Sequence, residues 1–557
     1  MFYVQNCIKK LYPEVNSEKF FLQEGKTSDY SFDQAYSLSK IVNKPVEDVL
    51  NEMYVELQTI PHISVEMQSP RILVNYTSEY LTEQINSLFN DVCNNNGKIS
   101  PPIKTKEKVL IDFSSPNFCK EMHVGHLRST IIGESLCRLF EYLGDEVLRV
   151  NHIGDWGTQF GMLIAYIKKY NVTEYNITTL TKMYKEAKKI FDSDPEFKSQ
   201  SREETFALQR GAEENVLIWK HLCQISLEEF NKIYNILGTH STVKGESFYQ
   251  QYMVDLLQQL QPHLVEDDGA KIIYANDNRL TLVKSDGAFT YDTSDLAALH
   301  YRLFVENVNK IVYIVDLGQK LHFETLFSVA NNLGFIGEKK LEYVGFGVVL
   351  GTDGKKLKTR SGETIKLSGL LEEAYSSALK LTSELTKNKY NEQTTANIAR
   401  KISINCIKYA DLSNPRISNY KYSSEKMLNT KGNTAVYLMY AMARCKSILR
   451  KVDFETLNNQ EIVINSKECR NLVFQILKYY EILDKTAKTL SPHHLCNYLY
   501  CLVTSLTKFY ETNRCIDFFP NGDIKSVNEP SVCLIYLSII VVNQLFYLIG
   551  LEQIDQI

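Results

Sequence analysis

A chain of 557 residues is too long for one hydrophobic core, and it should divide into about three or four domains. Its composition, with 44% hydrophobic and 23% charged residues, is that of a soluble globular protein. The net charge of −4 excludes nucleic-acid binding through overall charge, and the 12 cysteines lack the C-x-x-C pair typical of a zinc site.

The first segment carries no targeting signal. Residues 1–10 have neither the continuous apolar run of a signal peptide nor the arginine content of a transit peptide. Together with the scattered cysteines, this predicts reduced thiols and a cytoplasmic location.

Residues 1–103 are predicted to form a small α+β domain without an evident catalytic group. Residues 60–76 contain two strand-like runs around a Ser-Pro turn, and helical patterns lie at 47–57 and 80–92. The Asn- and Pro-rich segment 93–102 is the clearest linker in the chain.

A strand, a loop with two histidines and a helix follow the linker. The apolar run 109–113 predicts a buried strand, which a Ser-Ser-Pro-Asn turn ends. His123 and His126 come next, and a helical pattern extends from 127 to 144. This is how an α/β fold presents a phosphate site at the carboxyl end of a strand.

Residues 146–154 predict a second buried strand, which makes a right-handed βαβ unit of a parallel sheet. Three glycines between 154 and 161 permit tight turns and a close approach of the backbone to a ligand. A polar helical stretch from about 165 to 285 reads as an insertion, because strands resume near its end and at 310–316 and 343–350.

Residues 351–363 form a Gly-bounded basic loop after the last predicted strand, and helices dominate from there to the end. Such a loop can stabilise charge on a triphosphate, although a solvated basic loop is the commoner meaning of a lone cluster. The apolar stretch 531–551 has the length of a membrane span, but a buried helix of a bundle is the better interpretation.

A basic segment begins near residue 400. Between Arg400 and Lys451, eleven Lys or Arg face two acids, and five tyrosines are interleaved. Cations with exposed rings suit single-stranded RNA, whereas a solvated helix face with core tyrosines explains the pattern equally well.

The histidine pair can serve an ATP site. Imidazoles donate hydrogen bonds to phosphate oxygens, Gly125 leaves room for adenine, and a helix N-terminus favours negative charge. H-x-G-H alone is a weak match that structural histidines also produce, but its place between strand and helix strengthens it.

Three long motifs resemble the signatures of arginyl-tRNA synthetases, a class I family, with the match closest to eukaryotic cytosolic members. They are Ser114–Thr130, Asn151–Gly161 and Lys358–Thr364, and their order matches along nearly the whole chain. The resemblance implies an α/β Rossmann-type parallel-sheet catalytic domain with a helical insertion, an N-terminal α+β domain and a C-terminal all-α bundle. The expected boundaries are 1–103 for a tRNA-binding accessory domain, 104–409 for the catalytic domain with its insertion at about 165–285, and 410–557 for the anticodon-binding domain.

The resemblance also implies roles for individual residues. Those matched to ATP binding are His123, Gly125, His126 and Lys358. Those matched to arginine are Asp112 and Asn117 at the α-amino and carboxylate end, and Tyr291, Asp295 and Gln319 at the side chain. A carboxylate such as Asp295 can take a guanidinium bidentately, which lysine cannot reproduce. Tyr437 and Tyr440 match tyrosines that contact the anticodon loop.

One position departs from the class I pattern. Thr359 stands where the second signature usually has its fourth-position lysine. In the family a lysine just before the first signature is thought to substitute, and Lys120 occupies that position. Lys120, Lys356 and Lys358 are therefore the candidates for the catalytic cation.

The implied activity is that of an arginine–tRNA ligase. It activates L-arginine with ATP and Mg²⁺, without zinc, and transfers it to the 3′-terminal adenosine of tRNA-Arg in translation. We expect a cytoplasmic monomer with no membrane contact; the sequence names no protein partner. Two alternatives are another H-x-G-H nucleotide-transfer enzyme and a non-catalytic tRNA-binding relative.

Overall fold

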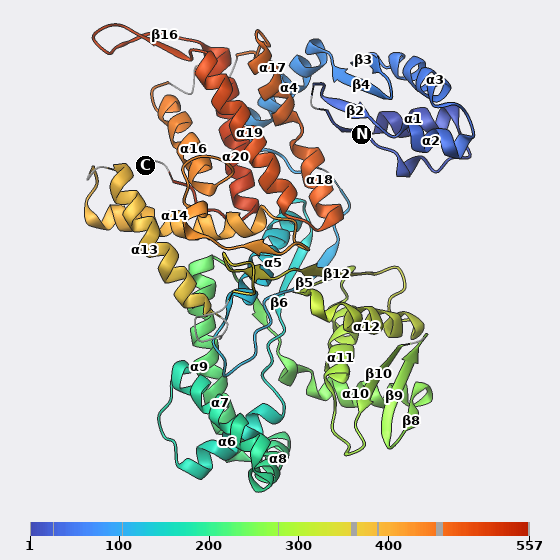
Figure 1. Cartoon of the computed structure of the whole chain (residues 1–557), viewed down its shortest axis with the longest axis vertical. Helices are drawn as coiled ribbons and strands as arrows, with labels where there is room; N and C mark the ends of the chain where they lie inside the picture. Colours follow the sequence, from blue (N-terminus) through green and yellow to red (C-terminus); the bar gives the residue numbers. More distant parts are fainter. Residues whose placement is uncertain are drawn as a thin grey trace. The chain divides into compact units, whose positions relative to one another are not determined.

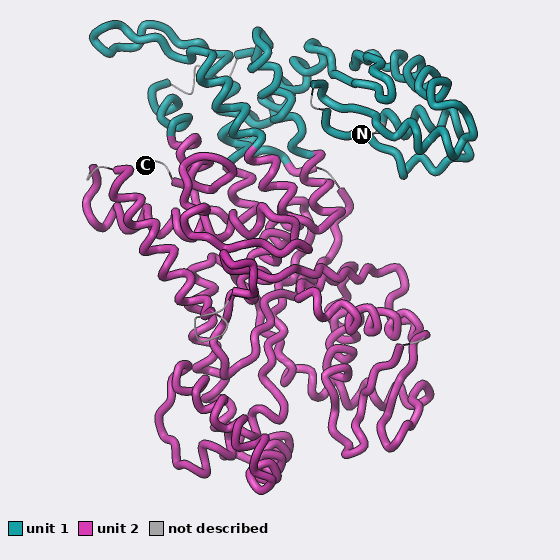
Figure 2. The backbone as a smooth tube through the Cα atoms, viewed as in Figure 1, with its two compact units in different colours: residues 1–100, 444–480, 501–542 teal, residues 101–443, 481–500, 543–557 magenta. Residues whose placement is uncertain are grey.

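The structure, a computed structural model, describes residues 2–25, 27–102, 104–276, 278–357, 365–386, 389–452 and 460–554. The chain forms two compact units (Figure 2). The first contains residues 1–100, 444–480 and 501–542, and the second contains 101–443, 481–500 and 543–557. The C-terminal part of the chain therefore contributes to both units.

The N-terminal part of the first unit has the predicted α+β structure, with an antiparallel sheet of order β1-β2-β4-β3. Its strands are β1 (Gln23–Glu24), β2 (Tyr30–Phe32), β3 (Ile63–Gln68) and β4 (Arg71–Tyr76). Its helices are α1 (Phe2–Leu11), η1 (Ser17–Lys19), α2 (Ala35–Val42), α3 (Val46–Gln58) and α4 (Ser78–Asn94). The predicted turn at Ser69-Pro70 joins β3 to β4, where Gln68 faces Arg71.

Helix α17 (Lys467–Leu477) belongs to the same unit and packs against α4. The two terminal nitrogens of Arg470 donate to the two oxygens of Asp29 at 2.9 and 2.8 Å. Asn86 of α4 donates to the carbonyl of Ile462 and accepts from its N–H, at 3.0 and 2.8 Å. A segment far along the sequence thus completes the packing of the N-terminal sheet.

The second unit is built on five parallel strands in the order β12-β11-β5-β6-β7. They are β5 (Lys108–Asp112), β6 (Glu146–Asn151), β7 (Thr242–Val243), β11 (Lys310–Asp316) and β12 (Lys340–Phe346). The first two predicted strands are confirmed as neighbours in one parallel sheet. Because the strand order reverses between β5 and β11, their carboxyl ends form the topological switch point where such sheets bind ligands.

The segments that connect the strands of the parallel sheet form separate groups of elements, one after β6 and another after β7 (Figure 1). Helix α5 (Val124–Tyr142) joins β5 to β6, and four helices follow β6: α6 (Thr158–Tyr170), α7 (Ile177–Ser193), α8 (Pro195–Gln209) and α9 (Glu213–Leu237). Between β7 and β11 the chain forms η2 (Glu246–Tyr249), α10 (Gln250–Leu260), η3 (Gln261–His263), β8 (Val265–Asp267), β9 (Ala270–Ala275), β10 (Asn278–Val283) and α11 (Tyr291–Phe304). The predicted helical insertion is present after β6, but β7 returns to the main sheet within the predicted range of about 165–285, which we did not predict. The strands predicted near its end form a small antiparallel sheet of their own.

After β11 come η4 (Leu317–Gln319), α12 (Lys320–Asn332) and β12. The last predicted strand, 343–350, is divided, because β13 (Val349–Leu350) leaves the sheet and pairs with β14 (Tyr420–Lys421). The backbone N–H of Gly347 donates to the carbonyl of Arg416 at 2.9 Å, so this crossover is held by the segment before β14.

The predicted helical C-terminal part is confirmed. Its helices are α13 (Leu367–Thr386), α14 (Glu392–Leu412), α15 (Ser424–Met427), α16 (Ala435–Leu449), α18 (Tyr479–Thr489), α19 (His493–Thr512) and α20 (Glu529–Leu548). A hairpin of β15 (Ile516–Phe518) and β16 (Ile524–Val527), which we did not predict, separates α19 from α20. Helix α20 is long and apolar enough to cross a membrane, but 72% of its most apolar window is buried, as expected of a core helix.

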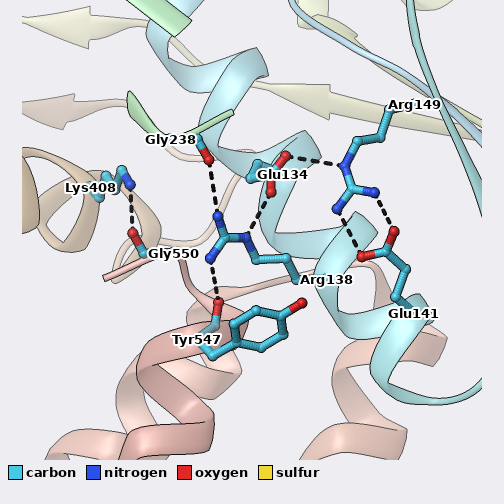
Figure 3. Close-up of polar contacts among 8 residues, drawn as sticks. All are labelled: Glu134, Arg138, Glu141, Arg149, Gly238, Lys408, Tyr547 and Gly550. Carbon is cyan, nitrogen blue, oxygen red and sulfur yellow. Dashed lines mark hydrogen bonds and ion pairs between the residues drawn. The ribbon is translucent and has the colours of Figure 1, made fainter. Parts of the chain in front are cut away.

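A polar cluster ties α5 to the end of α20 within the second unit (Figure 3). Arg138 of α5 donates to the carbonyls of Gly238 and Tyr547, at 3.0 and 3.1 Å, and pairs with Glu134 at 2.7 Å. The buried Lys408 donates to the carbonyl of Gly550. These cations satisfy carbonyls that the ends of α9 and α20 leave without helical partners.

Candidate active site

A cavity of about 560 Å³ lies at the carboxyl ends of β5 and β11. It brings together nine of the predicted site residues, from four separate stretches of the chain. These are Asp112, Asn117, His123, Gly125, His126, Tyr291, Asp295, Gln319 and Lys356. Its position at the switch point of the sheet is where the predicted strand and histidine loop should place a ligand site.

The two histidines form the first turn of α5. The Nδ1 atom of His123 accepts from the backbone N–H of Gly125 at 3.1 Å, and Nδ1 of His126 accepts from the N–H of His123 at 3.0 Å. Their rings stack with centroids 3.9 Å apart. A Cβ atom at position 125 would lie 2.9 Å from the His123 ring, so the glycine of the motif makes room for the stacked rings.

These contacts fix the protonation of both rings. Burial, with repulsion from Lys356, lowers the pKa of His123, and burial, with repulsion from His123, lowers the pKa of His126 to about 3. Both imidazoles are therefore neutral near pH 7. Because each Nδ1 accepts a hydrogen bond, each proton sits on Nε2, which leaves two N–H donors for a phosphate.

The loop between β5 and α5 is strongly bent. Ser114, Ser115 and Cys119 have φ angles of 73°, 45° and 62°, and the backbone of Asn117 bridges to that of Gly154. A Cβ atom at position 154 would lie 2.1 Å from Oδ1 of Asn117, so only glycine leaves space for this amide. The second motif thus sets the position of a side chain from the first.

Asp112, at the end of β5, is paired with an arginine of the chain. Its carboxylate accepts from Arg302 at 2.8 Å and from Ser115 at 3.0 Å, and the Arg302 side chain is only 1% exposed. Arg302 also contacts Nδ1 of His152 at 3.3 Å. Because arginine only donates, His152 carries its proton on Nε2, which lies 3.9 Å from Asp295.

Helix α11 places Tyr291 and Asp295 one turn apart on the cavity wall. Repulsion from Asp295, with burial and a hydrogen bond to that carboxylate, raises the pKa of Tyr291, so its hydroxyl is a donor. Gln319, in the turn after β11, lies on the same wall. A planar cation is thus offered one carboxylate with a phenol and an amide beside it.

Comparisons with known proteins agree with this geometry. The family described as "tRNA synthetases class I (R), catalytic domain" matches residues 89–424, and the "DALR anticodon binding domain" matches 438–557. The arginine–tRNA ligase of Acanthamoeba polyphaga mimivirus is 45% identical over 97% of this chain and 94% of its own. The human cytoplasmic enzyme is 39% identical over 99% and 87% of the two chains. The crystal structure of arginyl-tRNA synthetase from Plasmodium falciparum has a TM-score of 0.85 and 31% identity, covering 100% and 98%.

The chain belongs to the class I arginyl-tRNA synthetases. It is an arginine–tRNA ligase, and ATP is the nucleotide of its class.

The three candidate lysines of this synthetase differ in position. Lys356 lines the cavity. Lys120 is not among the lining residues; its Nζ lies 4.4 Å from the centre of the Tyr184 ring on α7. Lys358, like Thr359, lies outside the described residues.

Four titratable residues of the cavity were not predicted as site residues from the sequence: His152, Glu246, Tyr313 and Asp316. Glu246 of η2 lines the wall near Asp295, and burial with repulsion from Asp155 and Asp295 raises its pKa to about 8. Nothing around Gly245-Glu-Ser-Phe marks it as functional. Only the fold brings it to the cavity wall near Asp295.

The predicted anticodon tyrosines lie on α16, in the second unit. Tyr440 is 37% exposed, and the half-buried Tyr437 packs edge-on against Tyr500, with ring centroids 5.8 Å apart. By contrast, Tyr409, Tyr420 and Tyr422 are buried, so for these three the interpretation as core residues is confirmed.

The first unit holds a cavity of about 380 Å³ with a positive lining. Three cations line it, Arg444, Lys451 and Arg514; none of its described lining residues is acidic, and Asp517 pairs with Arg514 at 3.3 Å. The partly exposed rings of Tyr510 and Phe518 lie beside them. The basic segment of the sequence pointed to the first two cations but missed the other residues.

Proposed function

We propose that the 560 Å³ cavity binds L-arginine and ATP together and makes arginyl-adenylate. The carboxylate of arginine attacks the α-phosphorus of ATP; a P–O bond forms and pyrophosphate leaves. The terminal ribose of tRNA-Arg then attacks the carbonyl carbon, and AMP leaves. Class I membership favours the 2′-hydroxyl for this second step.

The observation that carries this proposal is the pairing of two chemistries in one cavity. Asp295, Tyr291 and Glu246 offer a carboxylate, a phenol and a second carboxyl to a guanidinium. His123 and His126 offer Nε2–H donors to phosphate. Asp112, at the end of β5, and Asn117, in the loop that follows, line the same cavity and suit the α-amino and carboxylate end of the substrate.

Positioning of the substrates and stabilisation of the charge that develops during the reaction account for most of the rate enhancement. Neutral histidines donate hydrogen bonds without competing with the substrate cation for the carboxylates. Lys356, with Lys120 and Lys358 as the other candidates, compensates the charge that develops on pyrophosphate. Mg²⁺ enters with ATP as part of the substrate and shields its phosphates.

The other partners follow from family membership. We assign tRNA-Arg binding to an accessory domain at 1–103, catalysis to 104–409 and anticodon binding to 410–557. Tyr437 and Tyr440 are the proposed anticodon contacts, and the positive cavity of the first unit supports RNA binding. Because cytoplasmic enzymes are among the similar relatives, we propose a cytoplasmic monomer.

The test is aminoacylation of total tRNA with each amino acid in turn, with and without ATP. Arginine alone should be transferred, and only with ATP. Asp295→Ala should abolish arginine-dependent ATP–pyrophosphate exchange measured with tRNA present, whereas Asp255→Ala, an exposed aspartate on α10, should not. Near-normal exchange by Asp295→Ala would overturn the pocket assignment.

A further inference from the structure

His322 of α12 lies between two carboxylates of α11. Its Nε2 is 2.7 Å from Oδ2 of Asp295, and its Nδ1 is 3.4 Å from Oδ1 of Asp292. The other oxygen of Asp292 accepts the backbone N–H of Thr281 at 2.9 Å, which fixes that carboxylate in turn. His322 is not among the residues that line the cavity, so it contacts Asp295 from outside the substrate space.

This geometry favours an imidazolium. A neutral imidazole donates from one nitrogen only, and a carboxylate only accepts, so two facing carboxylates are both satisfied only when both nitrogens carry protons. Burial opposes the charge, but the hydrogen bonds and attraction from Asp292 and Asp295 outweigh it and raise the pKa of His322 to about 9.

The imidazolium changes what the pocket offers a ligand. Asp292 and Asp295 contribute two negative charges, and His322 removes one of them. Asp112 is already neutralised by Arg302, and Glu246 is largely protonated near pH 7. These six side chains together therefore carry about one net negative charge, with the plane of Asp295 fixed from behind, and Asp316 adds a further carboxylate to the cavity lining.

We propose that His322 is a specificity-determining residue that acts through Asp295: its resident positive charge makes the pocket select its ligand by hydrogen-bond geometry rather than by charge. The proposal rests on the arginine pocket assigned above. A lysine ammonium is a point charge that gains from net negative charge and needs no particular carboxylate plane. A guanidinium also needs a carboxylate held in a fixed plane, where it can accept two hydrogen bonds. A resident cation weakens the attraction that depends on net charge but preserves the attraction that depends on this geometry.

The experiment measures the affinities of L-arginine and L-lysine by calorimetry for the full-length protein at pH 7.5 without ATP. His322→Gln removes the charge and the rigid bridge between Asp292 and Asp295, so the plane of Asp295 is no longer fixed. We expect lysine to bind about tenfold more tightly to this variant, because one unit of positive charge near the ligand is lost. Arginine gains the same attraction but loses the fixed plane of Asp295, so the arginine-to-lysine affinity ratio should fall about tenfold.

His322→Lys is the matched variant, because it keeps a cation beside Asp295. It should bind lysine as weakly as the unmodified protein does. Unchanged or weaker lysine binding by His322→Gln, or equally tight lysine binding by His322→Lys, overturns the inference.

The same measurements distinguish a failure of the proposed function from a failure of the role proposed for His322. If the unmodified protein neither binds arginine nor charges tRNA with it, the pocket assignment is wrong. If it does both and only the His322 variants behave otherwise than expected, the assignment stands and the role of His322 is refuted. Thermal unfolding of each variant identifies any that has lost its fold.

Discussion

The imidazole of His126 accepts a hydrogen bond from the backbone N–H of His123 at 3.0 Å. His123 in turn accepts from the N–H of Gly125, so the two side chains satisfy N–H groups that the first turn of α5 leaves without partners. Both histidines therefore cap the helix with Nδ1 and keep Nε2–H for a ligand. A lysine or arginine could not do this, because neither has an acceptor atom.

His123→Asn should separate these two roles. Asparagine is among the best N-cap residues, so the cap is retained, but its shorter side chain does not reproduce Nε2–H. We expect an unchanged melting temperature and a fall in ATP–pyrophosphate exchange of about a hundredfold. His123→Ala should lose activity and also about 1 kcal/mol of stability. Equal thermal stability of the two variants would show that His123 does not cap the helix.

Gly154→Ala should displace Asn117. The added methyl group would stand 2.1 Å from the Asn117 amide oxygen, and the backbone of Gly154 needs no left-handed conformation, so the effect is purely steric. A shift of about 1 Å in a substrate contact can cost about a hundredfold in rate, and we expect a loss of that order in arginine activation.

The control for Gly154 is Gly369 of α13, where a Cβ atom meets nothing within 4 Å. Gly369→Ala should leave exchange unchanged and raise stability by about 0.5–1 kcal/mol, because alanine is the better helix former. Activity near normal in Gly154→Ala would mean that the Asn117 amide is not a substrate contact.

The sequence predicted those parts of the site whose position depends on the order of neighbouring elements along the chain. A buried strand followed by a turn and a helix predicted the two histidines at the carboxyl edge of a sheet, whereas Asp112 and Asn117 were predicted as site residues by the family resemblance. Glu246 and His322 could not be found in this way. Each lies in an unremarkable stretch and comes close to Asp295 only because distant elements pack together there.

The β15–β16 hairpin was not predicted for a different reason, because a local signal for it was present in the sequence. Asn521-Gly522 stands between two short β-branched and aromatic runs, and Asn-Gly is the strongest short-range hairpin signal. The surrounding helical pattern hid it. The break of the last predicted strand at Gly347 had no such signal, because its cause is pairing with residues near Arg416.

Arginine affinity should depend on pH through Glu246. Its pKa is raised to about 8 in the free pocket, whereas a bound guanidinium favours the ionised carboxylate. Binding therefore releases a proton from Glu246, and the affinity should rise as the pH increases from about 6.5 to 8 and then level off. Within this window His322, with a pKa of about 9, stays protonated.

Calorimetric titrations with arginine across that window test the assignment. Glu246→Gln should bind arginine more weakly at pH 8 and show a much flatter pH dependence. Glu213→Gln, an exposed residue of α9, is the control and should keep the slope. A slope that survives in Glu246→Gln would assign the proton to another group.

The lysines can be ranked by separating arginine binding from adenylate formation. Lys356 lines the cavity, whereas Lys120 packs over the ring of Tyr184. The charges of both lysines help to lower the pKa of His123, that of Lys356 more strongly. Lys356→Ala should reduce the rate of exchange about a hundredfold with little change in arginine affinity, as expected for a cation that acts on the phosphates.

Lys120→Ala should show the same pattern if Lys120 replaces the lysine missing at Thr359. In that case Lys120 must leave the Tyr184 ring to reach ATP. Tyr184→Leu, which removes the cation–π contact, should then raise exchange or leave it unchanged. Equal losses of arginine binding and adenylate formation in Lys120→Ala would count against a phosphate contact and leave Lys356 as the catalytic cation among the described lysines.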